Sequence, residues 1–439
     1  MRRRLVVVTL GVLALVALAG CSAPLEADLG QENGYRYDAD ISVTMEDGLN
    51  ESEQTAVVSR AMARIERIRG VEFEKTVPVE VISREEFRNG SFGGRPTDLA
   101  NLSDRQLWNE QVWEALHIVG EDETYPSSSS SNRGATVVGY YSSREDQIVI
   151  VSDSPTPQIS RDTLVHELVH ALQDQQFNLG GNPQLQDEQI AENGVVEGEA
   201  NYIEATYRNR CGTRWSCIPL PERSGSSSPP DSFNRALFLT SFAPYAEGPW
   251  FIDAIRDRGG WEAVDDLYEN YPISTEQVIH PDAYPDERPE NVTLPDRSTA
   301  EWERFTNISR PVYDTVGEAS IYAMFQGNGV VNRTGSDQYD YDQRFSAGWD
   351  GDRLVPYRNG DRYGYVWRSE WESADEAREF VGAYRDLLDR QGADRLEDGR
   401  YRIASGPFAD AFRVTRSGET VTIVNAPRLA DLDSIHDAE

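Results

Sequence analysis

The chain has 439 residues, which is enough for one large domain or two ordinary domains with substantial cores. Acidic residues number 75 against 42 basic ones, and the formal net charge is −33. This charge argues against nucleic acid as a partner, because the phosphate backbone would be repelled. A disordered acidic chain fits poorly, because 38% of the residues are hydrophobic and 10% are aromatic.

The first 20 residues have the organisation of an export signal. Arg2-Arg3-Arg4 supplies positive charge, and the apolar stretch from Leu5 to Ala19 is short for a membrane-spanning helix. Leu18-Ala19-Gly20-Cys21 resembles the lipobox of prokaryotic lipoproteins, in which the cysteine is lipidated and becomes the first residue of the mature chain. We therefore expect a signal peptide at 1–20, a lipid-anchored linker at 21–35 and a location on the extracellular face of the cell membrane.

Two details of export stay open. An unprocessed signal anchor is the alternative to cleavage, and it would also leave the bulk of the protein outside the membrane. The order Arg-Arg-x-Leu-Val resembles a twin-arginine signal, which would export the protein already folded.

Cys211 and Cys217 are the only other cysteines. In an exported chain, a close pair in a loop that contains Gly212 predicts a disulfide. Zinc binding by the pair is the alternative, but no second Cys or His pair lies near it in the sequence.

The part of the chain before residue 160 predicts a helix, a strand, a loop and a hairpin. The helix is expected from Glu51 to Arg69, where apolar residues recur on one side, and the strand from Val77 to Ile82. Five consecutive serines within 126–134 predict a loop. Runs of β type at 135–141 and 147–151 predict a hairpin directly before the next helix.

Two histidines mark that next helix, 163–177, as a candidate for metal binding. The run has no proline or glycine, and its apolar positions lie three to four residues apart. His166 and His170 therefore lie one turn apart on one face, where two imidazole nitrogens can bind one ion. Glu167 is rotated by roughly 100° from His166, which suits the general base of a zinc hydrolase. The alternative is that the two histidines lie on a solvated helix face or in the core with their hydrogen bonds satisfied. Two stacked histidines and a carboxylate are, however, costly to bury without an ion.

A catalytic zinc ion needs a third protein ligand and one open position. The next helical run, 188–208, is the place to look for it. Its four candidates are Glu192, Glu197, Glu199 and Glu204. Residues two apart on a helix point about 200° apart, so Glu197 and Glu199 cannot both face the ion.

Asp174 has two interpretations. It lies one turn beyond His170, where its carboxylate could accept a hydrogen bond from a ligand imidazole and fix the tautomer. Alternatively it is a solvated or capping residue near the end of the helix.

The order of these motifs resembles the gluzincin metallopeptidases, the thermolysin-like and aminopeptidase N-like group. In the aminopeptidases of that group, the third ligand is the glutamate of a Glu-Gly-x-Ala motif. The resemblance of Glu197-Gly-Glu-Ala200 to this motif implies that Glu197 binds the metal. It also implies a zincin-like fold and a downstream His or Tyr that hydrogen-bonds the oxyanion, for which His280 and Tyr284 are the candidates. The long separation between His170 and Glu197 departs from the usual spacing in those enzymes.

Longer segments resemble a poorly characterised family of prokaryotic, halophilic-archaeal-like secreted zinc peptidases. The four segments are His166–Gln175, Val196–Ala200, Ser274–Pro281 and Gly348–Arg353. This resemblance spans residues 136–370 and brings no known substrate. An acidic composition in which Lys75 is the single lysine also resembles proteins of extreme halophiles, where carboxylates keep a surface hydrated at molar salt.

The rest of the chain predicts a helical half followed by a smaller α+β region. A helical stretch at 231–257 should be interrupted near Pro244 and Pro249, and the last core helix is expected at 311–325. A polar linker follows at 326–343. Further strands are expected at 352–357, 363–368, 400–404, 411–415 and 419–425, with a helix at 373–389.

The expected fold class is α+β, with a zincin-like (thermolysin-like) metallopeptidase core at 36–335 and a smaller α+β region at 336–439. The core should have an N-terminal mixed sheet and a helical C-terminal half. The expected function is zinc-dependent hydrolysis of peptide bonds in a peptide or protein substrate. A surface-binding lipoprotein with a non-catalytic zinc site and a zinc hydrolase of another amide or ester are the alternatives.

Overall fold

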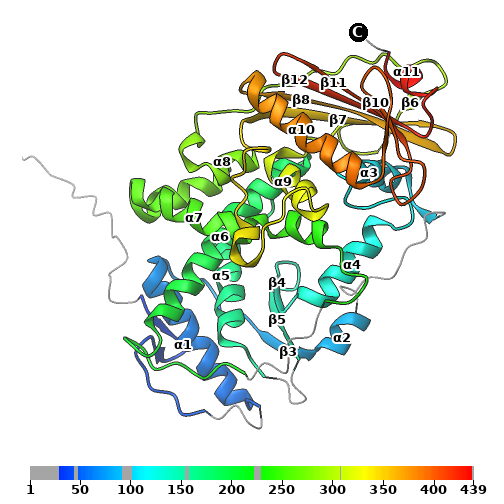
Figure 1. Ribbon diagram of the computed structural model, residues 1–439. Coiled ribbons are helices and arrows are strands. Elements are labelled where there is room, and N and C mark those ends of the chain that lie inside the picture. The colour runs from blue at the N-terminus through cyan, green and yellow to red at the C-terminus, as the bar shows by residue number, and fades with distance from the viewer. Residues whose placement is uncertain are drawn as a thin grey trace, which may run out of the picture.

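A computed structural model describes residues 29–43, 48–90, 101–153, 158–221, 229–306 and 308–437. The expected signal peptide and Cys21 lie outside these residues. Within them, no helix is long and apolar enough to cross a membrane. The fold is α+β, as expected, with a small mixed sheet, a helical middle and a large antiparallel sheet near the C-terminus (Figure 1).

The N-terminal sheet is mixed and confirms the expected strand and hairpin. Its strands are β3 (Val79–Ser83), β5 (Gln147–Ser152) and β4 (Gly139–Ser142), in that spatial order. β3 runs parallel to β5, and β4 runs antiparallel to it. Because β5 lies between the other two, β4 is an edge strand of this sheet.

Three helices pack with this sheet around one hydrophobic core. They are α1 (Glu51–Arg69), α5 (Arg161–Phe177) and α6 (Gln186–Arg210). Asn50 caps α1 and Gly70 ends it in the left-handed conformation, which is why the expected bounds are confirmed. A hairpin of β1 (Gln31–Glu32) and β2 (Tyr35–Arg36) packs on α1, so part of the expected linker belongs to the folded body.

The serine-rich stretch is a helix, so the predicted loop at 126–134 is wrong. α4 (Tyr125–Thr136) is capped by the side chain of Thr124 and has a proline in its first turn. Asn132 exchanges two hydrogen bonds with the backbone of Asn234, at 2.8 and 2.9 Å. Capping and tertiary contacts therefore outweigh the modest helix propensity of serine. The remaining helices of this part are α2 (Arg84–Asn89) and α3 (Asp104–Ala115).

The long helix α7 (Arg235–Asp265) passes through both of its prolines without a break. The expected interruption near Pro244 and Pro249 is therefore wrong, because burial of this face against α6 holds the helix together. The break lies later, where Gly260 has a φ of 72°.

Buried aspartates join the starts of three helices to the C-terminal sheet. Asp352 of β7 (Trp349–Asn359) accepts hydrogen bonds from the backbone of Val316 and Gly317, at 3.1 and 3.0 Å, where α9 (Gly317–Gly327) begins. Asp187 of α6 accepts two from Thr275, at 3.0 and 2.6 Å, where α8 (Thr275–Ile279) begins. By accepting these hydrogen bonds, the two side chains fix how α6, α8 and α9 meet.

The C-terminal region forms an antiparallel sheet with helices on it, and its expected strands and helix are confirmed. Within the described residues the strand order is β6-β7-β8-β12-β11-β10-β9. The bounds are β6 Glu303–Arg304, β7 Trp349–Asn359, β8 Arg362–Trp371, β9 Asp394–Arg395, β10 Arg400–Arg402, β11 Ala411–Ser417, β12 Thr420–Ala426, α10 Ala374–Arg390 and α11 Leu432–Ile435. Short 3₁₀ helices occur at Asp266–Tyr268, Pro281–Ala283 and Gly335–Tyr339.

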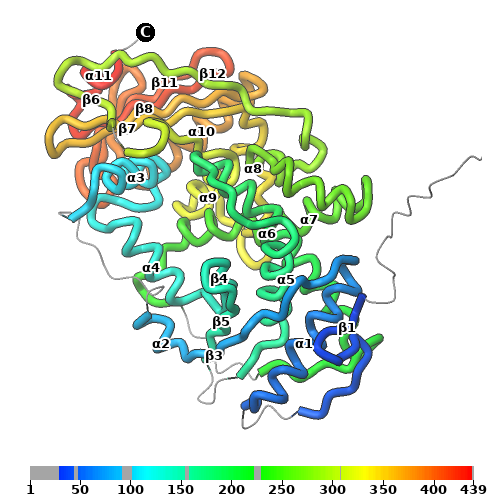
Figure 2. Tube along the Cα trace, turned by 180° about the vertical axis from the view of Figure 1, so that it is seen from behind, coloured from blue at the N-terminus to red at the C-terminus, as the bar shows by residue number. Residues whose placement is uncertain are grey.

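One hydrophobic core joins this sheet to helices far away in the sequence. α10 lies across one face of the sheet, and α3 lies under the same end of the molecule in both views (Figures 1 and 2). Trp108 of α3, Met324 of α9 and Trp367 of β8 belong to the same buried cluster. The division between 36–335 and 336–439 stays a prediction, and the sheet itself includes β6 at 303–304.

We expect the contribution of Asp187 to folding stability to fall as the pH rises from 3.8 to about 8. Burial, together with Asp352 and Glu318, raises the pKa of Asp187 from 3.8 to about 8, although Thr275 opposes the shift. The folded state therefore holds a proton that the unfolded state releases. This contribution to the free energy of unfolding is fully present below the pKa that Asp187 has in the unfolded state. It is lost as the pH rises through about 8.

Asp187→Asn keeps an oxygen for Thr275 and cannot ionise. Thermal unfolding should show a smaller loss of Tm between about pH 6 and pH 9 in this variant than in the wild type. An equal loss in both proteins would contradict the assignment to Asp187.

Candidate metal centre

The two histidines of α5 face α6 because the rest of the helix is held in the core. Leu164, Val165 and Leu168 are at most 1% exposed, and Ser160 caps the helix by accepting a hydrogen bond from the backbone of Thr163. With these positions fixed, His166 and His170 lie one turn apart on the same side. The expected metal-binding helix is thus in place.

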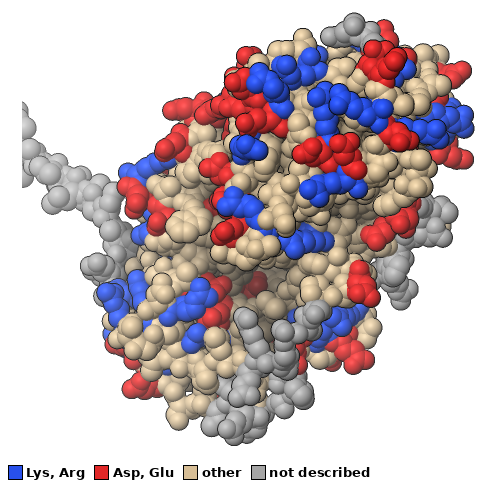
Figure 3. Space-filling view, in the orientation of Figure 1, with Lys and Arg blue, Asp and Glu red and all other residues tan. Residues whose placement is uncertain are grey.

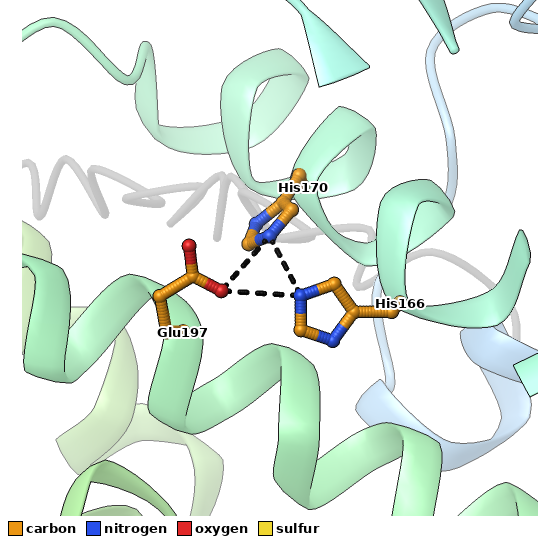
Figure 4. Close-up of side chains that lie close together, drawn as sticks. All are labelled: His166, His170 and Glu197. Atoms are coloured by element: carbon orange, nitrogen blue, oxygen red, sulfur yellow. Dashed lines mark hydrogen bonds and ion pairs between the residues drawn. The ribbon is translucent and has the colours of Figure 1, made fainter. Parts of the chain in front are cut away.

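Three ligand atoms from α5 and α6 converge at one point (Figure 4). The Nε2 atoms of His166 and His170 lie 3.1 Å apart. Oε2 of Glu197 lies 3.1 Å from Nε2 of His166 and 3.3 Å from Nε2 of His170. Among the four competing glutamates, Glu197 is the one that the structure brings to both imidazoles.

These atoms have the chemistry and the spacing of a zinc site. Two imidazole nitrogens and one carboxylate oxygen are the protein ligands of one class of catalytic zinc sites. Ligand atoms about 2.1 Å from a tetrahedral ion lie about 3.4 Å from one another, close to the distances of 3.1 to 3.3 Å here. The three side chains are 10 to 19% exposed, so the group is largely shielded from solvent.

The electrostatics of the group favour positive charge at this point. Burial acts to raise the pKa of Glu197, but His170 and His166 outweigh it and hold the pKa well below its usual range. Burial acts to lower the pKa of His166, but Glu197 and Glu204 raise it to about 10. A buried carboxylate that stays ionised needs a cationic partner, which a metal ion can supply.

The outer nitrogens of both imidazoles have partners that orient the rings. Nδ1 of His170 lies 2.8 Å from Oε1 of Gln173, whose amide nitrogen donates to the backbone of Val196 on α6 at 2.9 Å. Nδ1 of His166 lies 3.6 Å from a carboxylate oxygen of Glu204. Such contacts turn the inner nitrogens toward a shared ion.

Two of the other acidic candidates have different partners. Glu199 forms a buried ion pair with Arg69 and accepts hydrogen bonds from Tyr268 and Gln173. Asp174 accepts a hydrogen bond from the hydroxyl of Tyr141 in β4 at 2.8 Å. Of the two interpretations of Asp174, the one as a residue that orients a ligand imidazole is not supported, because Gln173 contacts Nδ1 of His170 at 2.8 Å.

Glu167 lies between the ligands and the edge strand β4. It is buried, and burial raises its pKa. A Cβ atom on Gly139 would lie 3.2 Å from Oε1 of Glu167, so the strand approaches the carboxylate closely because this residue has no side chain. On the face shown in Figure 3, the surface is hollowed in the region where Figure 1 places β4 and α5.

Tyr245 of α7 is the residue of this site that the sequence did not reveal. Its ring centroid lies 6.1 Å from that of His166, and 38% of the residue is exposed. Burial of the phenol and the charges of Glu197 and Glu167 raise the pKa of Tyr245 well above its usual value. A protonated hydroxyl beside the ligands is a candidate donor to a developing oxyanion.

A close crossing of α6 and α7 brings Tyr245 to the site. A Cβ atom on Gly248 would lie 2.4 Å from the carbonyl oxygen of Gly194 and 2.8 Å from Cα of Gly198. The only signals in the sequence are these glycines inside helical runs, and nothing in the pattern shows that they meet.

His280 and Tyr284 make their contacts away from the three ligands. His280 pairs with the buried Glu318 of α9 at 3.1 Å. The hydroxyl of Tyr284 donates to the backbone carbonyl of Asn270 at 2.6 Å. The oxyanion roles expected for these two residues find no support in this geometry. The expected disulfide between Cys211 and Cys217, at the end of α6, is confirmed.

Comparison with protein families gives one match, and it lies outside the metal centre. A family described as a domain of unknown function (DUF8575) matches residues 303–436, which run from β6 to α11. Comparison with the curated proteins gave no match, and comparison with the solved structures gave none.

We expect Gly248→Ala to lower the free energy of unfolding by about 1–3 kcal/mol, because the added methyl group forces two backbones apart. Gly382→Ala is the matched control, since a Cβ atom there meets nothing within 4 Å in the helix α10. That change should stabilise the protein by about 0.5–1 kcal/mol. Urea unfolding of both variants measures the difference, and a Gly248→Ala variant as stable as the control would contradict the close crossing.

Removal of a proposed ligand should abolish tight zinc binding. Changes to residues that only hydrogen-bond a ligand cost about 10–100-fold in metal affinity, so Glu197→Gln should cost more than about 100-fold. Glu192→Gln on the same helix should leave the affinity unchanged. Competition with a chromophoric chelator measures both constants. Equal affinities in the two variants would rule out Glu197 as a ligand.

Proposed function

We propose that the chain is an exported, lipid-anchored zinc peptidase in which His166, His170 and Glu197 hold the metal and Glu167 is the general base. One observation carries this proposal: three ligand atoms converge beside a buried carboxylate and an edge strand. The motif order shared with the gluzincins supports the same roles.

Zinc held by these residues would supply a Lewis acid that makes water nucleophilic near neutral pH and polarises the substrate carbonyl. The protein would contribute the geometry. Gln173 and Glu204 would orient the two imidazoles.

Glu167 would move the proton. Its carboxylate takes a proton from the attacking water as the new C–O bond forms. It then gives this proton to the amide nitrogen as the C–N bond breaks, so hydrolysis consumes one water and leaves Glu167 ionised. Burial raises its pKa toward the range in which it can both accept and return the proton.

The edge strand and Tyr245 would position the substrate. Among the described residues, β4 has one side without a strand partner in its sheet, so an extended peptide could pair with its backbone beside Glu167. The hydroxyl of Tyr245 would then donate a hydrogen bond to the carbonyl oxygen as that oxygen gains negative charge.

The general-base role predicts that Glu167→Gln binds zinc like the wild type and loses peptidase activity. A fluorogenic peptide library in molar salt, matched to the acidic composition, is the assay. Wild-type protein with bound zinc but no activity across the library would favour a binding protein with a non-catalytic zinc site.

Tyr245→Phe should lower kcat by about 100-fold or more with little change in KM, because its hydrogen bond strengthens only in the transition state. Tyr284→Phe is the comparison, since the sequence assigned the same role to that residue. A larger loss of kcat in Tyr284→Phe than in Tyr245→Phe would contradict the geometry.

A further inference from the structure

A row of aromatic side chains extends along α7 away from the metal centre. This aromatic row consists of Phe233, Phe238, Phe242, Tyr245 and Tyr339. The ring centroid of Phe238 lies 5.4 Å from that of Phe233 and 5.1 Å from that of Phe242. The ring centroid of Phe242 lies 5.8 Å from that of Tyr245 and 4.6 Å from that of Tyr339. Because Tyr245 stacks with His166, the row is continuous with the proposed zinc site.

The rings of the row lie on one face of α7 and outside the cores of the protein. Phe238, Phe242 and Tyr245 project within about 60° of one another around the helix axis. Tyr245 is 38% exposed, and the other four members of the row are half-buried. Among the described residues, none of the five rings belongs to a hydrophobic core. Aromatic side chains that pack on one another at the surface indicate a binding surface.

The far end of the row lies near the start of the edge strand β4. Asn234, which directly follows Phe233, exchanges hydrogen bonds with Asn132 of α4 at 2.8 and 2.9 Å. Only residues 137 and 138 separate α4 from β4. The row and β4 therefore both border the region between the metal centre and the end of α4, and a peptide paired with β4 would lie in this region.

We propose that the aromatic row binds an aromatic side chain of the peptide substrate, about two to four residues from the bond that is cleaved. This assignment rests on the proposed peptidase function. Successive residues of an extended peptide advance about 3.3 Å, so each step of 5.1 or 5.8 Å between rings spans about two residues. Phe242 lies one step beyond Tyr245 and therefore meets a residue some way from the cleaved bond.

The chemistry of the row selects an aromatic side chain. Aromatic rings favour offset-stacked or edge-to-face contacts with other rings, at centroid distances of about 4.5–7 Å. The members of the row already contact one another at such distances. A neutral ring also avoids repulsion by a chain whose net charge is −33, whereas an acidic side chain of a substrate would be repelled.

Mass spectrometry of peptide cleavage by the zinc-loaded protein in molar salt tests the proposal. The substrates are peptides of one sequence in which a single phenylalanine, or an alanine in its place, is moved along the chain. We expect cleavage about two to four residues from the phenylalanine, always on the same side of it. The matching alanine peptides should be cleaved with a kcat/KM at least about 10-fold lower.

Phe242→Ala should lower kcat/KM about 10-fold for the phenylalanine peptides and leave kcat/KM for the alanine peptides unchanged. A purely structural effect would lower both values equally. Trp250→Ala is the matched control, because Trp250 is 71% exposed on the same helix and projects about 140° away from Tyr245. If Phe242→Ala fails to fold, Phe242→Leu keeps most of the apolar volume and should shift the preference toward aliphatic side chains.

Wild-type activity without a preference for phenylalanine would overturn the proposal and leave the peptidase function standing. Equal losses for both sets of peptides in Phe242→Ala and Phe242→Leu would also overturn it. A wild-type dimer that Phe242→Ala dissociates in sedimentation, with unchanged preference, would assign the row to contact between two copies and overturn the proposal as well. Absence of cleavage in every peptide would contradict the peptidase function itself, and this assignment with it.

Discussion

The close crossing of α6 and α7 is the contact on which the metal centre depends. Gly198 and Gly248 let the two backbones approach to a distance that no side chain would permit. The crossing holds α6 against the rest of the helical middle, and it places Tyr245 beside His166. Gly198 directly follows Glu197, the proposed metal ligand, so the glycine of the Glu-Gly-x-Ala motif has a packing role next to a residue with a proposed chemical role.

The grouping of the three candidate ligands was largely predictable from the sequence because the geometry of the two histidines is local. His166 and His170 are related by one helical turn, and Glu197 stood among four candidates until a resemblance selected it. Tyr245 was not predictable, because its place depends on a contact between two helices. The same reason explains the missed helix α4, whose serine-rich sequence is held by Asn234 from α7.

Buried carboxylates also hold helices of this structure together. Segments at 274–281 and 348–353, which resemble a family of secreted peptidases, form the junction where Asp187 and Asp352 bind the starts of α8 and α9. His280 belongs to this junction through Glu318. Its pairing with Glu318 contributes to the contact between α8 and α9, and the acidic composition of the chain extends into its interior.

The motif, the fold and the proposed chemistry all meet at the proposed zinc centre, so locating the ion is the most direct test. Anomalous diffraction at the zinc edge from crystals of the zinc-loaded protein measures its position. The account predicts one peak about 2.1 Å from Nε2 of His166, Nε2 of His170 and a carboxylate oxygen of Glu197, with a non-protein fourth ligand facing Glu167. No peak at this point, or an ion enclosed by four protein ligands, would contradict it.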